Sequence, residues 1–231
     1  MIANLSVIGV LQIVYLLIDR INGRDIGVVE PGVNLYLSVN RLGTDMPQTT
    51  GDTEDRILDL AEVMIRTRGY NGFSFREIAS DVGVKSSSVH YYFPTKADLG
   101  ARVARRYSDR FLKALGDPQE APRNAAEVLE KMHRSFARAL GADGQMCLCD
   151  VLAAEAAGLP AAVAEEAPEF FSRTSGWLHR SLQRTEWGRS RSHEDIERQS
   201  LTVLAQLEGG LLIARVQGNP ELFEQLKPEL P

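Results

Sequence analysis

The run of residues 86–92, SSSVHYY, concentrates hydroxyl, imidazole and phenol groups where a solvated helix would normally carry lysine and glutamate. Such groups exchange hydrogen bonds with phosphate oxygens and base edges, and an aromatic ring can contact a thymine methyl group. We predict that His90 and Tyr91 reach bases, whereas Tyr92 either reaches a phosphate or packs in the core. The predicted DNA contacts of this run are Ser86, Ser87, Ser88, His90, Tyr91 and Tyr92.

Two short helices and a tight turn are needed to position these side chains. The hydroxyl of Ser74 can cap the first of these two helices, and Glu77 can complete a capping box. Gly83 suits the left-handed conformation that ends a helix. A serine of residues 86–87 can cap the second helix, which would end near Phe93, before a proline. A helix-turn-helix places its second helix in the major groove of DNA.

The stretch of residues 53–99 resembles the DNA-binding domain of TetR-family transcriptional regulators. Four features carry the resemblance: a first helix that ends at Gly69-Tyr70, the set Phe73, Ile78 and Ala79, the turn Gly83-Val84, and the run Ser88-Val89-His90-Tyr91-Tyr92-Phe93 followed by Lys96. The family usually has tyrosine where His90 stands and leucine where Val89 stands. These departures bear on the operator sequence and not on the fold.

The resemblance also implies roles for two basic side chains. Arg76 would reach DNA bases or phosphates, although a solvated surface arginine is the alternative. Lys96 would contact a phosphate, which sets the register of a protein on DNA but not its sequence preference.

Composition fits a globular chain, with 44% hydrophobic and 25% charged residues among 231. The net charge of −5 argues weakly against a nucleic-acid partner. A local excess of basic residues follows the motif, however: Arg102, Arg105, Arg106, Arg110 and Lys113. Two cysteines separated by one residue do not make a disulfide framework, so we expect a cytoplasmic protein.

Three parts are expected along the chain. Residues 1–45 are either a mis-called start or a membrane-tethering or interaction arm; their apolar run 5–18 is too short for a confident membrane span. Residues 46–95 form the DNA-binding domain. Residues 96–231 form an effector-binding and dimerisation domain. We predict helices over 96–115, 124–140, 150–158, 161–184 (broken near Pro168), 194–217 and 220–226, and therefore an all-α fold.

The resemblance implies that the last two long helices form a homodimeric four-helix bundle, and the pair Gly209-Gly210 would allow another helix to approach closely. Aromatic and sulfur side chains at helical spacing either line an effector pocket or form plain core. The predicted pocket residues are Tyr107, Met132, His133, Phe136, Cys147 and Trp177.

The pair Cys147 and Cys149 has three interpretations. Both can be small buried hydrophobes, which free cysteine often is, and we favour this interpretation. A redox or electrophile sensor would need exposure and a lowered thiol pKa. A metal site with His133 or His179 is the third, but the spacing is not that of a structural zinc motif.

Together with these patterns, the resemblance implies a ligand-responsive repressor that binds a pseudo-palindromic operator in double-stranded DNA as a homodimer. A redox-sensing repressor acting through Cys147 and Cys149 and a helical interaction protein without DNA affinity are the alternatives. The chain has no Gly-rich phosphate loop, no HExxH and no GxSxG, so we expect neither an enzyme nor a cofactor. No metal and no membrane partner are expected.

Overall fold

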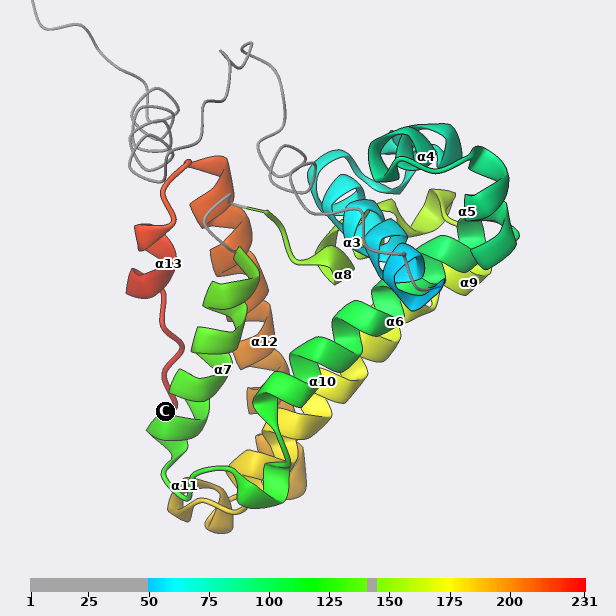
Figure 1. Ribbon diagram of the computed structural model, residues 1–231. Coiled ribbons are helices and arrows are strands. Elements are labelled where there is room, and N and C mark those ends of the chain that lie inside the picture. The colour runs from blue at the N-terminus through cyan, green and yellow to red at the C-terminus, as the bar shows by residue number, and fades with distance from the viewer. Residues whose placement is uncertain (1–49, 141–144) are drawn as a thin grey trace, which may run out of the picture. The chain divides into compact units, whose positions relative to one another are not determined.

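The computed structural model describes residues 50–140 and 145–231, which form helices and no strand within these ranges (Figure 1). The predicted all-α class is confirmed. The expectations for residues 1–45 and for the loop 141–144 lie outside the described residues. The helices are α3 (Thr50–Arg68), α4 (Phe75–Val82), α5 (Ser86–Tyr92), α6 (Lys96–Leu115), α7 (Ala125–Leu140), α8 (Leu148–Glu155), α9 (Ala161–Ala164), α10 (Glu166–Gln183), α11 (Glu186–Arg189), α12 (His193–Val216) and α13 (Glu221–Gln225).

Helices α3, α4 and α5 form a three-helix unit in which α4 and α5 pair closely. Ser74 caps α4 by accepting a hydrogen bond from the Glu77 amide at 3.2 Å. Gly83 ends α4 at a φ of 78°, in the left-handed region that favours glycine. The prediction that a serine caps α5 is wrong: Lys85 occupies the N-cap without a side-chain hydrogen bond, and the serines lie inside the first turn.

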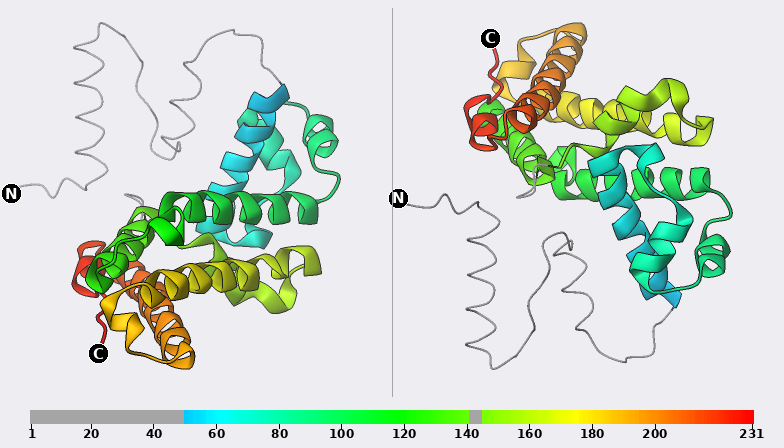
Figure 2. Two further views of the ribbon diagram at one scale, coloured as in Figure 1. Left: turned by 90° about the horizontal axis from the view of Figure 1, so that it is seen from below. Right: turned by 90° about the horizontal axis from the view of Figure 1, so that it is seen from above.

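Helix α6 leads from this unit into the rest of the chain and has the predicted bounds. Thr95 and Asp98 close a capping box at its start, and Gly116 ends it at a φ of 71°. In both views of Figure 2, α6 runs alongside α10, with which it packs. Its buried stripe comprises Leu99, Val103, Tyr107, Phe111 and Leu115.

The remaining helices pack around α10, which contacts α6, α7, α8 and α12. The predicted break near Pro168 lies instead at Glu165, between α9 and α10. Pro168 sits in the first turn of α10, where a backbone N–H has no partner within the helix, so proline is tolerated there. The helix predicted over 150–158 starts at Leu148 and finishes as a 3₁₀ turn, Ala156–Gly158. The short α11 was not predicted.

No helix within the described residues has the length and apolar character needed to span a membrane.

Candidate nucleic-acid interface

Helix α5 is strongly one-sided. Val89 is fully buried and Phe93, its C-cap, is 4% exposed, so these two side chains anchor the helix on the core. Tyr91 is 77% exposed, which is unusual for a large aromatic side chain. The predicted residues Ser86, Ser87 and His90 are also exposed, whereas Ser88 and Tyr92 are half-buried. The structure therefore brings most of the predicted contact residues together on the outer face of one helix.

Aromatic neighbours contact the rings of His90 and Tyr91 on this face. The His90 ring lies edge-on to Phe75 of α4, with centroids 4.7 Å apart, and its Nδ1 lies 3.4 Å from the Pro94 carbonyl oxygen. With the proton on Nδ1, this nitrogen donates to the carbonyl and Nε2 is left as an acceptor. Tyr91 lies edge-on to Tyr92 at 5.2 Å. Both rings thus have neighbours that restrict their orientation.

Two exposed basic residues stand beside this face. Arg76, on α4, was predicted, and it forms no hydrogen bond or ion pair with another described residue. Lys85, directly before α5, was not among the predicted contacts and is equally unpaired within the described ranges. Its position directly before the start of α5 could have indicated it, because a cation there adds positive charge next to the exposed face of that helix.

Lys96 is directed into the protein. Its Nζ donates to the Phe73 carbonyl oxygen at 2.7 Å and lies 4.3 Å from the Phe73 ring centroid and 4.9 Å from that of Tyr70. Burial lowers the pKa of Lys96, while Glu155 acts in the opposite direction. The ammonium ties the start of α6 to the end of the α3–α4 turn. Its predicted phosphate contact stays a prediction.

Three of the basic residues of α6 form ion pairs with carboxylates of neighbouring helices. Arg106 contacts Asp59 at 2.6 Å, and Arg110 donates to both oxygens of Glu62 at 2.7 Å. Arg105 pairs with Glu166 of α10 at 2.6 Å. Helical spacing alone does not reveal that α3 and α10 present carboxylates to these three side chains.

Helix α8 connects the three-helix unit to the rest of the protein. Its Glu155 accepts a hydrogen bond from the Tyr70 amide at 3.0 Å. Gly69, at a φ of 81°, leaves no room for a β-carbon, which would meet the Glu155 carboxylate at 2.0 Å. Arg66 of α3 donates to the carbonyl oxygen of Met146 at 2.7 Å, just before α8, and to that of Ala139 in α7. These contacts link the position of α3 to that of α7 and α8.

The six predicted pocket residues are all buried, with exposures of 5% or less. They do not share one site. The Tyr107 hydroxyl lies 3.5 Å from the Cys147 sulfur, whereas the His133 ring is stacked on Phe223 at 4.5 Å. Trp177 donates to the Gly116 carbonyl oxygen at 2.8 Å. The effector pocket stays a prediction.

Both cysteines are free and fully buried, as the favoured interpretation predicted. Burial raises the pKa of the Cys147 thiol well above its ordinary value. A reactive thiol needs exposure and a lowered pKa, so this arrangement does not favour a redox or electrophile sensor.

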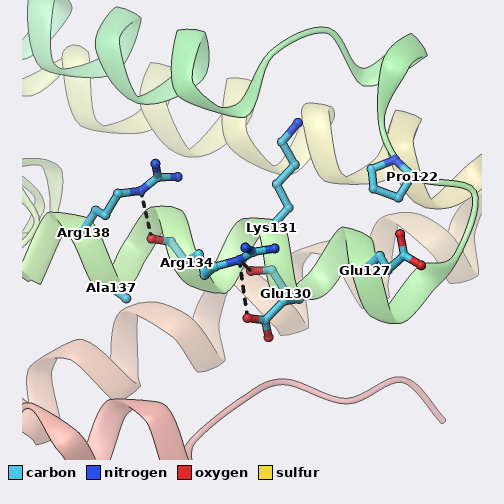
Figure 3. A pocket seen from close by; sticks show the side chains of 7 residues that line it. All are labelled: Pro122, Glu127, Glu130, Lys131, Arg134, Ala137 and Arg138. Atoms are coloured by element: carbon cyan, nitrogen blue, oxygen red, sulfur yellow. Dashed lines mark hydrogen bonds and ion pairs between the residues drawn. The ribbon is translucent and has the colours of Figure 1, made fainter.

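A surface groove of about 660 Å³ runs along α7 and is lined by charged side chains from Glu127 to Arg138 (Figure 3). Its Arg134 Nε lies 3.4 Å from a Glu130 carboxylate oxygen. Its lining mixes three basic side chains with two acidic ones, so the groove offers no uniform charge for a ligand.

Comparisons with known proteins agree with this arrangement. Residues 57–103 match the family model described as bacterial regulatory proteins, tetR family. The chain is 24% identical over 172 residues to the HTH-type transcriptional regulator LmrA of Bacillus subtilis (strain 168), covering 73% of this chain and 89% of LmrA. It is 28% identical over 95 residues to the HTH-type transcriptional repressor KstR2 of Mycolicibacterium smegmatis, covering 41% and 45% of the two chains.

The crystal structure of a TetR transcriptional regulator from Legionella pneumophila aligns with a TM-score of 0.70 at 29% identity, covering 80% of this chain and 96% of that one. A helix-turn-helix places its second helix in the major groove of DNA. Residues 57–103 therefore form a DNA-binding domain of the TetR family, and the chain is similar over most of its length to a solved TetR transcriptional regulator.

Proposed function

We propose that this protein is a ligand-responsive repressor whose dimer inserts two copies of α5 into a pseudo-palindromic operator. The outward face of α5, with Tyr91 77% exposed above a buried Val89, carries this proposal. A twofold dimer presents two such helices to half-sites about one helical turn apart. Repression is supported by the name of the similar KstR2. DNA contacts from Arg76 and from the exposed residues of α5 belong to the same proposal.

The proposed dimer forms through α12, which has apolar residues on two opposite faces. One face, including Val203, Leu207 and Leu211, is buried against the protein's own core. The other is exposed and includes Leu201 at 53% and Val216 at 78%. An apolar stripe of this kind on a protein surface marks an interaction site. The exposed stripe comprises Leu201, Ala205, Leu212, Ile213 and Val216.

Two adjacent glycines in α12 allow a test of this interface. A β-carbon at Gly209 would meet nothing within 4 Å, whereas one at Gly210 would lie 3.3 Å from the Phe223 ring. Gly209→Asp is therefore expected to leave the fold intact but to place a charge in the dimer interface, shifting the protein to monomers in light scattering. Gln225→Asp, which adds the same charge at an exposed site, is expected to leave the dimer unchanged. A dimeric Gly209→Asp protein would contradict the proposed interface.

The proposed effector acts on the aromatic core between α6, α7 and α10. The Phe111 ring lies 4.9 Å from that of Phe136 and 5.2 Å from that of Phe170. A small molecule that separated these rings would move α6 and α7, and the contacts of α8 and Arg66 would carry the movement to α3. In one conformation of the dimer the two copies of α5 would be wrongly spaced for the operator. The ligand releases the operator only to the extent that it binds this conformation more tightly than the DNA-binding one.

Gel-shift titration of the full chain against the DNA neighbouring its gene tests the proposal. The expected result is specific binding that weakens steeply with salt, by about 10³-fold between 50 and 200 mM for six phosphate contacts, because basic side chains displace counterions. An interaction protein without DNA affinity would bind no fragment even at low salt, and that result would refute the proposed function.

A further inference from the structure

Three acidic groups meet where α8 begins beside α12. The Cys147 sulfur and one carboxylate oxygen each of Asp150 and Glu208 all lie within 4.8 Å of one another. Cys147 is fully buried, and the two carboxylate residues are half-buried. The least favoured interpretation of the cysteines paired them with His133 or His179, but the His133 ring is stacked on Phe223 and the His179 ring lies against His193. The side chains that lie close to Cys147 are instead the carboxylates of Asp150 and Glu208.

The Glu208 carboxylate is an unusual member of this cluster. Both of its oxygens are buried, and within the described ranges no hydrogen-bond donor outside the cluster reaches them; their polar neighbours are Asp150 and Cys147. Within residues 50–140 and 145–231, no lysine or arginine forms an ion pair with Asp150 or Glu208. A buried carboxylate without a compensating charge is costly, so an empty cluster must retain protons. Accordingly, burial raises the pKa of Glu208 and of Cys147 well above their ordinary values, and also raises that of Asp150.

We propose that Cys147, Asp150 and Glu208 bind a divalent metal ion of the Zn²⁺ type. A thiolate with two carboxylates suits Zn²⁺, whereas Mg²⁺ and Ca²⁺ prefer oxygen ligands alone. Zinc bonds of about 2.0–2.3 Å place the ligand atoms of a tetrahedral site about 3.3–3.7 Å apart, so small side-chain rotations close the present cluster. A fourth position is left for water or a small ligand.

Metal binding would displace protons from the cluster. As the metal bonds form, the Cys147 thiol and the protonated carboxyl group each release a proton to solvent. The bound ion would connect the first turn of α8 to α12. Metal binding at this cluster does not require the protein to bind DNA, so its test is independent of the proposed repressor function.

Cobalt and zinc titrations of the metal-free full chain test the site. Co²⁺ is expected to give thiolate-to-cobalt charge-transfer absorption that saturates at a single ion per chain and is lost in Cys147→Ser. Glu208→Gln and Asp150→Asn are each expected to weaken Zn²⁺ binding by about 100-fold or more, measured by competition with a chromophoric chelator, because even outer-shell changes cost 10–100-fold. Circular dichroism confirms that each variant is folded.

Cys149→Ser is the matched control, because Cys149 is equally buried two residues away but lies outside the three-ligand set. It should retain both the charge-transfer band and the zinc affinity. The site is refuted if the wild type binds neither ion, or if the band depends on Cys149 instead of Cys147. Should Cys147→Ser fail to fold, unchanged zinc affinity in the two carboxylate variants would refute it equally.

Discussion

Replacing His90 and Tyr91 together with alanine is expected to lower operator affinity by about 100-fold while the protein stays folded and dimeric. Each good base contact contributes about 1–3 kcal/mol of discrimination, so losing two accounts for this change. The fold should tolerate the change because Tyr91 is 77% exposed. The edge-on contact of His90 with Phe75 is the main packing loss, and such a ring pair contributes about 0.5–1.5 kcal/mol. Gel-shift titration against operator and unrelated DNA measures the effect.

The variant Lys85→Ala distinguishes base reading from general attraction. A lysine at the edge of α5 that meets a phosphate should weaken binding to every sequence alike and reduce the salt slope by about 1. The His90 and Tyr91 double variant should instead lose the difference between operator and unrelated DNA, with its salt slope nearly unchanged. A double variant that binds the operator as tightly as the wild type does would show that another surface reads the sequence.

Helix α5 could be predicted from the sequence because its signals are local. Gly83 marks a left-handed turn. The buried residues Val89 and Phe93 lie four positions apart, which is the spacing of one face of a helix. The bounds of α6 follow likewise from a capping box at Thr95 and a terminal glycine. Each of these features depends on residues within a few positions of one another, so one sequence carries the whole signal.

Partners far apart in the chain could not be predicted in this way. Arg106 looks like a free cation until α3 places Asp59 within 2.6 Å of it. Glu208 looks like an ordinary residue of an amphipathic helix until α8 brings Cys147 and Asp150 beside it. Long side chains reach partners that only the tertiary packing supplies, and the candidate metal cluster therefore has no counterpart in the local pattern.

Substitution of Arg66 by methionine is expected to lower the free energy of unfolding by about 2–4 kcal/mol. The guanidinium of Arg66 donates to the Met146 carbonyl oxygen at 2.7 Å and to that of Ala139, and it lies 3.8 Å from a Glu62 oxygen. Hydrogen bonds that involve a charged group contribute about 1.5–3 kcal/mol each, and the partial exposure of these carbonyls reduces their combined effect. Methionine retains the apolar stem but donates no hydrogen bond. Urea unfolding at constant protein concentration measures the change.

Arg68→Met provides the comparison. Arg68 lies two residues after Arg66 in the last turn of the same helix, and its side chain is 49% exposed beside Glu77. An exposed ion pair contributes about 0–1 kcal/mol, so this variant should unfold almost as the wild type does. The difference between the two arginines would then measure the connection between α3 and the α7–α8 segment, and not the loss of a positive charge. Equal destabilisation in both variants would mean that the carbonyl contacts of Arg66 add little, and α3 would then be held to the rest of the protein mainly by its packing on α6.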